Sequence, residues 1–94
     1  MIDYKNMLIS LDQIDDMRHA IGYEPTQMRR GQRCFKFMRN YFFCSQPSPT
    51  WEDLCKHGLA GATPRSEREI IYYVSADGLK ALEYIYKVRF EEGR

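Results

Sequence analysis

The side chains that could bind a metal ion are Cys55 and His57, separated by one residue, with Cys34 and Cys44 elsewhere in the chain. Structural zinc sites are usually built from two pairs of closely spaced ligands, and only one such pair occurs here. Free cysteine is among the residue types most often buried. We therefore interpret the cysteines as reduced core residues, and we expect neither a metal ion nor a cofactor.

The candidates for acid–base chemistry are His19 and His57. Each is expected near the C-terminal end of a helix, where the helix dipole alone stabilises a positive charge. The sequence contains no glycine-rich phosphate loop and no pair of carboxylates in a known catalytic motif. We predict that the protein is not an enzyme.

The remaining candidates are binding residues in a basic and aromatic stretch, TQMRRGQRCFKFMRNYFFC at residues 26–44. Residues 25–51 contain five basic side chains and no acidic one, although the formal net charge of the chain is only +1. These candidate binding residues are Arg29, Arg30, Arg33, Lys36 and Arg39. Five phosphate contacts would give binding with a log–log salt slope of about −4. Nucleic acid or a nucleoprotein complex is therefore the first partner that we predict.

The rings in this stretch allow two interpretations. Apolar side chains repeat at helical spacing, which favours a helix or an irregular helical turn over residues 33–43. Rings in small domains are usually buried, so we expect part of the segment to lie in the core. In the alternative, exposed Tyr41 or Phe37 would stack on bases. The side chains expected in the core are Phe35, Met38, Tyr41 and Phe42.

The two polar residues before the last rings have structural interpretations as well. Asn40 could hold a backbone turn through its side chain. Arg39 could clamp a carboxylate such as Asp15 or Asp16. We favour this role for Arg39 and leave a ligand contact open.

A second group of candidate binding residues lies in TPRSER, at residues 63–68. Arg65 and Arg68 could contact phosphates or the minor groove of DNA. Glu67 and Glu69 alternate with them, which favours a solvated hairpin of mixed charge.

The first of three expected helices covers residues 11–21. Ser10 can cap its N-terminus, Gln13 completes a capping box, and Gly22 is placed to end it in the left-handed conformation. Its expected inward stripe, with arginine as the amphipathic member, is Leu11, Ile14, Met17, Arg18 and Ile21.

The second expected helix follows the loop QPSP. Ser48 is its N-cap, Pro49 its first residue and Glu52 the acidic member of a capping box. Gly58 ends this helix, and Leu59 folds back onto it.

The C-terminal part contains a strand and a third helix. Residues 69–75, EIIYYVS, have a strong β preference, and residues 60–62 are expected to pair with them in a hairpin. Ser75 then caps the last helix, and residues 91–94 form a frayed polar end. Surplus apolar surface on that helix leaves a homodimer as an open alternative. The side chains concerned are Leu82, Tyr84, Ile85, Tyr86, Val88 and Phe90.

Residues 54–85 read LCKHGLAGATPRSEREIIYYVSADGLKALEYI. They resemble the C-terminal half of winged-helix proteins, in which a helix ending in GL is followed by a hairpin wing, a strand and a final helix. The resemblance covers about a third of the chain and implies a winged-helix-like fold. The preceding part departs from the pattern of a DNA-recognition helix, so no DNA contact is carried over.

Four short motifs, RHAIGY, RNYFFC, GLA and YYVSADG, occur in this order. They resemble small proteins encoded by phages and prophages, which read HALG, RNYF, GLA and VTxxG and generally lack an assigned function. This resemblance spans most of the chain. It implies an origin in a mobile element and a small accessory role, without catalytic residues.

The whole sequence limits these expectations. Its 94 residues are expected to form one domain, 1–94, with a modest core. The start shows no signal sequence and no apolar run approaches the ~20 residues that span a bilayer, so we expect no membrane and a location in the cytoplasm of a bacterial host cell. The predicted fold is α+β and winged-helix-like, with three or four helices and an antiparallel β-hairpin.

The function that we predict is non-catalytic binding by a small phage-type accessory protein, to nucleic acid or to a nucleic-acid-handling complex. The alternative is a protein-interaction inhibitor of a host defence or replication enzyme, similar in kind to an anti-CRISPR protein, which makes no nucleic-acid contact.

Overall fold

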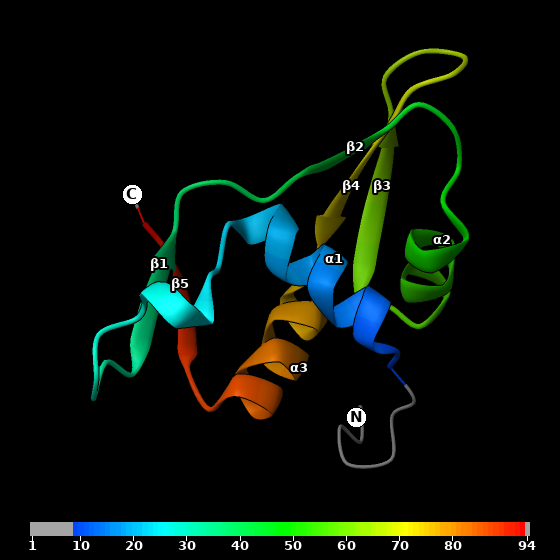
Figure 1. Ribbon diagram of the computed structural model, residues 1–94. Helices are drawn as coiled ribbons and strands as arrows, with labels where there is room; N and C mark the ends of the chain where they lie inside the picture. The colour runs from blue at the N-terminus through cyan, green and yellow to red at the C-terminus, as the bar shows by residue number, and fades with distance from the viewer. Residues whose placement is uncertain (1–8, 94) are drawn as a thin grey trace.

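The computed structural model describes residues 9–93, and within them it has a mixed α+β fold with three α-helices and two small sheets (Figure 1). The start of the chain, where we expect no signal sequence, lies outside the described residues. No helix among residues 9–93 is long and apolar enough to cross a membrane. In chain order the elements are α1 (Leu11–Ile21), the 3-10 helix η1 (Pro25–Gln27), β1 (Cys34–Phe37), β2 (Phe42–Cys44), α2 (Pro49–Lys56), β3 (Ala60–Pro64), β4 (Ile70–Val74), α3 (Ala76–Tyr86) and β5 (Arg89–Glu92).

The larger sheet has three antiparallel strands in the order β2-β4-β3. Its hairpin, β3–β4, confirms the expected pairing of residues 60–62 with the strand that follows. Successive side chains of β4 point to opposite faces, and Tyr72 and Val74 are buried. Tyr72 stacks on Trp51 of α2, while Val74 lies against Gly78 of α3. The helices therefore cover one face of this sheet.

The helix boundaries follow the local signals. Ser10 Oγ accepts a hydrogen bond from the Gln13 backbone N–H, and Gln13 Oε1 accepts one from Ser10 N–H, which confirms the capping box of α1. Gly22 ends α1 with φ of 71°. At the end of α2, Leu59 N–H donates to the carbonyl of Leu54 (2.9 Å), as expected for a chain that folds back on the helix.

The predicted capping box of α2 is wrong. Ser48 Oγ accepts from Trp51 N–H, so Trp51 occupies the third helical position and Glu52 lies one residue too far along. The Glu52 carboxylate accepts a hydrogen bond from the Tyr72 hydroxyl instead (2.6 Å).

The helical prediction for residues 33–43 is also wrong, because two strands lie there. β1 pairs in parallel with β5, so the predicted frayed end at residues 91–94 is corrected for its described part as well. This pairing provides hydrogen-bond partners for backbone carbonyls at both ends of β1: Arg33 O accepts from Arg89 N–H, and Phe37 O accepts from Gly93 N–H. A partner strand more than 50 residues away decides the local conformation here.

The core contains two aromatic groups. Trp51 stacks on Tyr72, with ring centres 5.5 Å apart. Tyr23 lies at the centre of the second group, and its ring centre is 4.9–5.2 Å from those of three neighbours. These neighbours are Phe35, Tyr86 and Phe90. Three residues predicted to face inward are exposed instead, namely Leu11, Met38 and Tyr41, whereas Phe37 is buried.

Candidate nucleic-acid interface

The most basic part of the chain is a hydrogen-bonded turn. Gln32 N–H donates to Arg29 O (2.9 Å), and Gly31 adopts φ of 82°, which suits the third position of a type II turn and disfavours residues with a Cβ. The Gln32 side chain accepts from Arg29 N–H (3.1 Å) and donates to Cys34 O (2.9 Å). Arg30 therefore stands at the tip of a loop whose backbone is joined to β1. We call residues 29–33 the basic turn.

The positive charges of the basic turn and of Lys36 are not neutralised within the described part of the chain. Arg29, Arg30, Arg33 and Lys36 are exposed and form no ion pair with any residue in 9–93. Glu91 is in register with Lys36 across the parallel pair, but its carboxylate lies 2.9 Å from Arg89 Nε. The basic turn therefore presents positive charge to solvent.

Arg39 has a structural partner that differs from the predicted one. Its Nη2 donates to the carbonyl of His19 (3.1 Å), not to Asp15 or Asp16. The guanidinium thus lies at the C-terminal end of α1, where the helix dipole favours a positive charge. It also packs closely against Gly22, since a Cβ at this glycine would be 3.3 Å from Arg39 Nε.

The Asn40 side chain forms hydrogen bonds with a strand, so the prediction that it holds a local backbone turn is wrong. Its Nδ2 donates to Val74 O, and its Oδ1 accepts from Val74 N–H, both at 2.8 Å. The Asn40 side chain therefore forms the two hydrogen bonds that the backbone of a neighbouring strand would form at the end of β4. These bonds fix the position of the chain just before β2.

The hairpin arginines lie away from the basic turn. Arg65 Nε is 3.8 Å from Glu69 Oε2, and Arg65 Cζ is 6.0 Å from the centre of the Phe43 ring. Arg68 is exposed and forms no ion pair within residues 9–93. This confirms the expected mixture of charges in the loop between β3 and β4.

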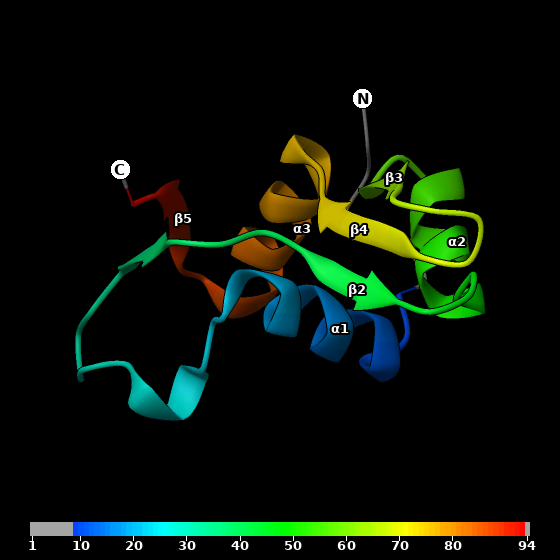
Figure 2. The same ribbon diagram turned by 90° about the horizontal axis from the view of Figure 1, so that it is seen from above.

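The structure divides the predicted binding residues between two ends of the molecule, whose longest extent is 44 Å. The basic turn and Lys36 belong to the end formed by β1 and β5, whereas Arg65 and Arg68 lie beyond the far end of the hairpin (Figure 1). Residues 34–44 run from one end to the other, with Arg39 between the two strands (Figure 2).

The uncovered face of the three-stranded sheet is an aromatic surface, of which the sequence indicated only Tyr41, as an alternative. Tyr41, Phe43 and Tyr73 are 56%, 47% and 41% exposed, and Ile71 lies in register with Phe43. We call Phe43, Tyr73 and Ile71, together with Tyr41 directly before β2, the outer face. Tyr73 pairs with Gly61, and its ring occupies the space where a Cβ of Gly61 would lie. A glycine opposite an aromatic residue in a hairpin is the signal that would have indicated this face.

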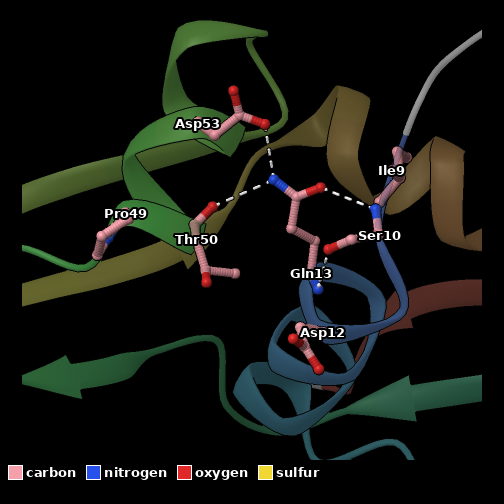
Figure 3. A pocket seen from close by; sticks show the side chains of 7 residues that line it. All are labelled: Ile9, Ser10, Asp12, Gln13, Pro49, Thr50 and Asp53. Carbon is pink, nitrogen blue, oxygen red and sulfur yellow. Dashed lines mark hydrogen bonds between the residues drawn. The ribbon is translucent and has the colours of Figure 1, made fainter.

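Another groove lies elsewhere, where α1 begins beside α2 (Figure 3). It has a volume of about 620 Å³, and Asp12 and Asp53 line it. The buried Gln13 side chain donates to Asp53 Oδ2 (2.7 Å) and to Thr50 O (3.3 Å). The two carboxylates would repel phosphate, and the buried amide already has partners. This groove is therefore a helix–helix contact that is unsuited to nucleic acid.

The surroundings of two partly buried thiols make them less reactive. Burial raises the pKa of the Cys44 and Cys55 thiols, with smaller contributions from Asp16 and Glu52 respectively, and this disfavours the nucleophilic thiolate. Residues 9–93 contain no group of three or more His, Cys, Asp or Glu side chains that could hold a metal ion.

Comparisons of the chain with protein-family models, with curated proteins and with solved structures found no match. The resemblances to winged-helix proteins and to phage-encoded proteins therefore rest on the quoted motifs, and they stay predictions.

Proposed function

We propose that the chain acts without catalysis, as a small phage-type accessory protein that binds nucleic acid or a nucleic-acid-handling complex through the basic turn. The observation that carries this proposal is the exposure of Arg29, Arg30 and Arg33 without an ion pair to any residue in 9–93. A guanidinium can form two parallel hydrogen bonds to a phosphate, so three of them on one ordered turn suit a phosphate backbone. The proposed setting is the cytoplasm of a bacterial host cell.

The second part of the proposal is a winged-helix-like arrangement that does not read the major groove. The order α2, β3, β4, α3 fits the part of that fold around the wing. However, α2 has only eight residues and exposes Glu52 and Asp53, whose carboxylates would repel the phosphates beside a groove. The basic turn is therefore proposed as the primary contact, with Lys36, Arg39, Arg65 and Arg68 as further contacts.

The test is fluorescence anisotropy with labelled DNA and RNA oligonucleotides at several salt concentrations. Replacing Arg29 and Arg30 by alanine should weaken binding and lower the log–log salt slope by about 1.5, because each lost phosphate contact removes about 0.7–0.9. The matched control is Lys56→Ala with Lys80→Ala, which removes equal charge from exposed positions on α2 and α3. Absence of binding to every probe at low salt would refute the proposal.

A second candidate function is inhibition of a host defence or replication enzyme by surface contact. The observation that favours it is the outer face, because exposed aromatic rings also suit a protein partner. It predicts a complex that persists after nuclease treatment and that is lost with Phe43→Ser. The mass of the purified protein, measured by light scattering, would show whether it forms a homodimer.

A further inference from the structure

We propose that the outer face is a stacking platform for the bases of single-stranded nucleic acid. This inference rests on the proposed function and names its substrate class. It assigns the aromatic contact to Phe43 and Tyr73 on the sheet and to Tyr41 directly before β2, while the basic turn supplies phosphate contacts at the other end of the long axis of the molecule.

The first step is the position of the rings. Phe43 on β2 and Tyr73 on β4 project from the face that the helices leave uncovered, and Ile71 lies beside Phe43 in the pairing. The Tyr73 ring crosses β3 above Gly61, where no side chain competes for the space. A row of partly exposed rings on a sheet is therefore available, and each ring can stack on any base because every base has a π-face.

The second step is the charge around the rings. A depression of about 230 Å³ beside Tyr41 and Phe43 is also lined by His19 and Arg39. On the other side, the Arg65 guanidinium lies 6.0 Å from the Phe43 ring centre. Cationic groups thus flank the rings on both sides, which matches a chain of phosphates that passes over stacked bases.

Glu69 partly balances the positive charge of Arg65. Its carboxylate lies 3.8 Å from the Arg65 guanidinium. Arg68, in the same loop, has no ion pair within residues 9–93. Arg39 forms no ion pair within residues 9–93, and its hydrogen-bond partner is a backbone carbonyl.

The third step distinguishes a single strand from a duplex. Bases in a duplex are stacked on each other and inaccessible to rings on a flat sheet, whereas single-stranded bases can leave the stack and lie on aromatic side chains. Residues 34–44 connect the basic turn to the outer face (Figure 2), and the proposed strand contacts both. Single-strand sites on OB folds, which also bind through aromatic side chains on a sheet, cover about 4–16 nucleotides.

The experiment compares fluorescein-labelled oligo-dT of about 15 nucleotides with a duplex of the same length. The variant Phe43→Leu/Tyr73→Leu keeps apolar side chains on the sheet and removes the rings. We expect its affinity for oligo-dT to fall at least about fivefold, since each stacked base contributes about 1–3 kcal/mol. The control Tyr84→Leu removes a partly exposed ring from α3 and should bind oligo-dT as the original protein does. Thermal unfolding of each variant shows whether its fold is kept.

The outcomes separate the two proposals. If oligo-dT binds the ring variant unchanged, or if the original protein prefers the duplex, the stacking platform is refuted, while salt-sensitive binding still supports the proposed function. If neither probe binds at low salt, both proposals fail.

Photo-crosslinking gives a readout that does not depend on variants. Oligo-dT with 5-iodouracil at single positions should crosslink to Tyr41, Phe43 or Tyr73, as identified by mass spectrometry of the peptides. Crosslinks confined to α2 or α3, or to the basic turn alone, would overturn the stacking platform.

Discussion

At the scale of single residues, the Tyr72 hydroxyl joins the sheet to α2. It donates to Glu52 Oε2 (2.6 Å) and accepts from Ser48 N–H (3.1 Å), while its ring stacks on Trp51. The side chain is fully buried. Burial, together with the hydrogen bond to Glu52, raises the pKa of Tyr72 to about 12. The proton on this hydroxyl is therefore part of what stabilises the fold.

This pKa shift predicts how stability depends on alkaline pH. In the unfolded chain a tyrosine has a pKa of about 10, so the unfolded state loses its proton first as the pH rises. The stabilisation is complete below about pH 10 and is lost as the pH rises through about 12. Urea unfolding between pH 8 and 11.5 should show this loss, and Tyr72→Phe should reduce the loss relative to the original protein. An equal pH dependence in Tyr72→Phe would contradict the prediction.

At the scale of elements, the parts that the sequence predicts well are those that local side chains determine. The capping box at Ser10, the glycine at position 22 and the Ser75 cap of α3 each lie within a few residues of the helix end that they define. β1 has no such signal, because its hydrogen bonds come from β5, which follows more than 50 residues later. Asn40 likewise binds Val74, 34 residues away. The sequence thus identified the basic residues, but it could not predict where they lie in the fold.

A glycine in the first turn of α3 shows how closely these elements pack. A Cβ at Gly78 would overlap the backbone carbonyl oxygen of Leu59 and crowd the Val74 side chain. Alanine normally favours a helix by about 1 kcal/mol over glycine. Here we expect Gly78→Ala to lower the free energy of unfolding by about 1–3 kcal/mol, because a backbone atom has to move.

Gly61→Ala is the matched control for this substitution. The three atoms nearest to its Cβ would all belong to the outer end of the Tyr73 side chain, which can turn away. The free energy of unfolding, measured in urea, should therefore change by less than about 1 kcal/mol. Equal losses for the two alanine variants would contradict this account of α3 packing.

At the scale of the whole molecule, positive charge is separated from negative charge along the chain. The formal net charge is +1, yet residues 25–51 contain five basic and no acidic side chains. The carboxylates of Asp12 and Asp53 line the groove between α1 and α2. At physiological salt the Debye length is about 8 Å, much shorter than the 44 Å extent of the molecule. A polyanion should therefore respond to the local charge of the basic turn more than to the net charge.

Charge reversal tests this expectation directly. Arg29→Glu with Arg30→Glu and Lys56→Glu with Lys80→Glu each remove four units of charge, so both pairs bring the formal net charge from +1 to −3. We expect the first pair to weaken nucleic-acid binding by more than about tenfold at physiological salt, because it replaces attraction by repulsion at the contact. The second pair should change binding only slightly, since its charges are screened from the basic turn. If both pairs weakened binding equally in anisotropy titrations, net charge rather than the basic turn would govern binding.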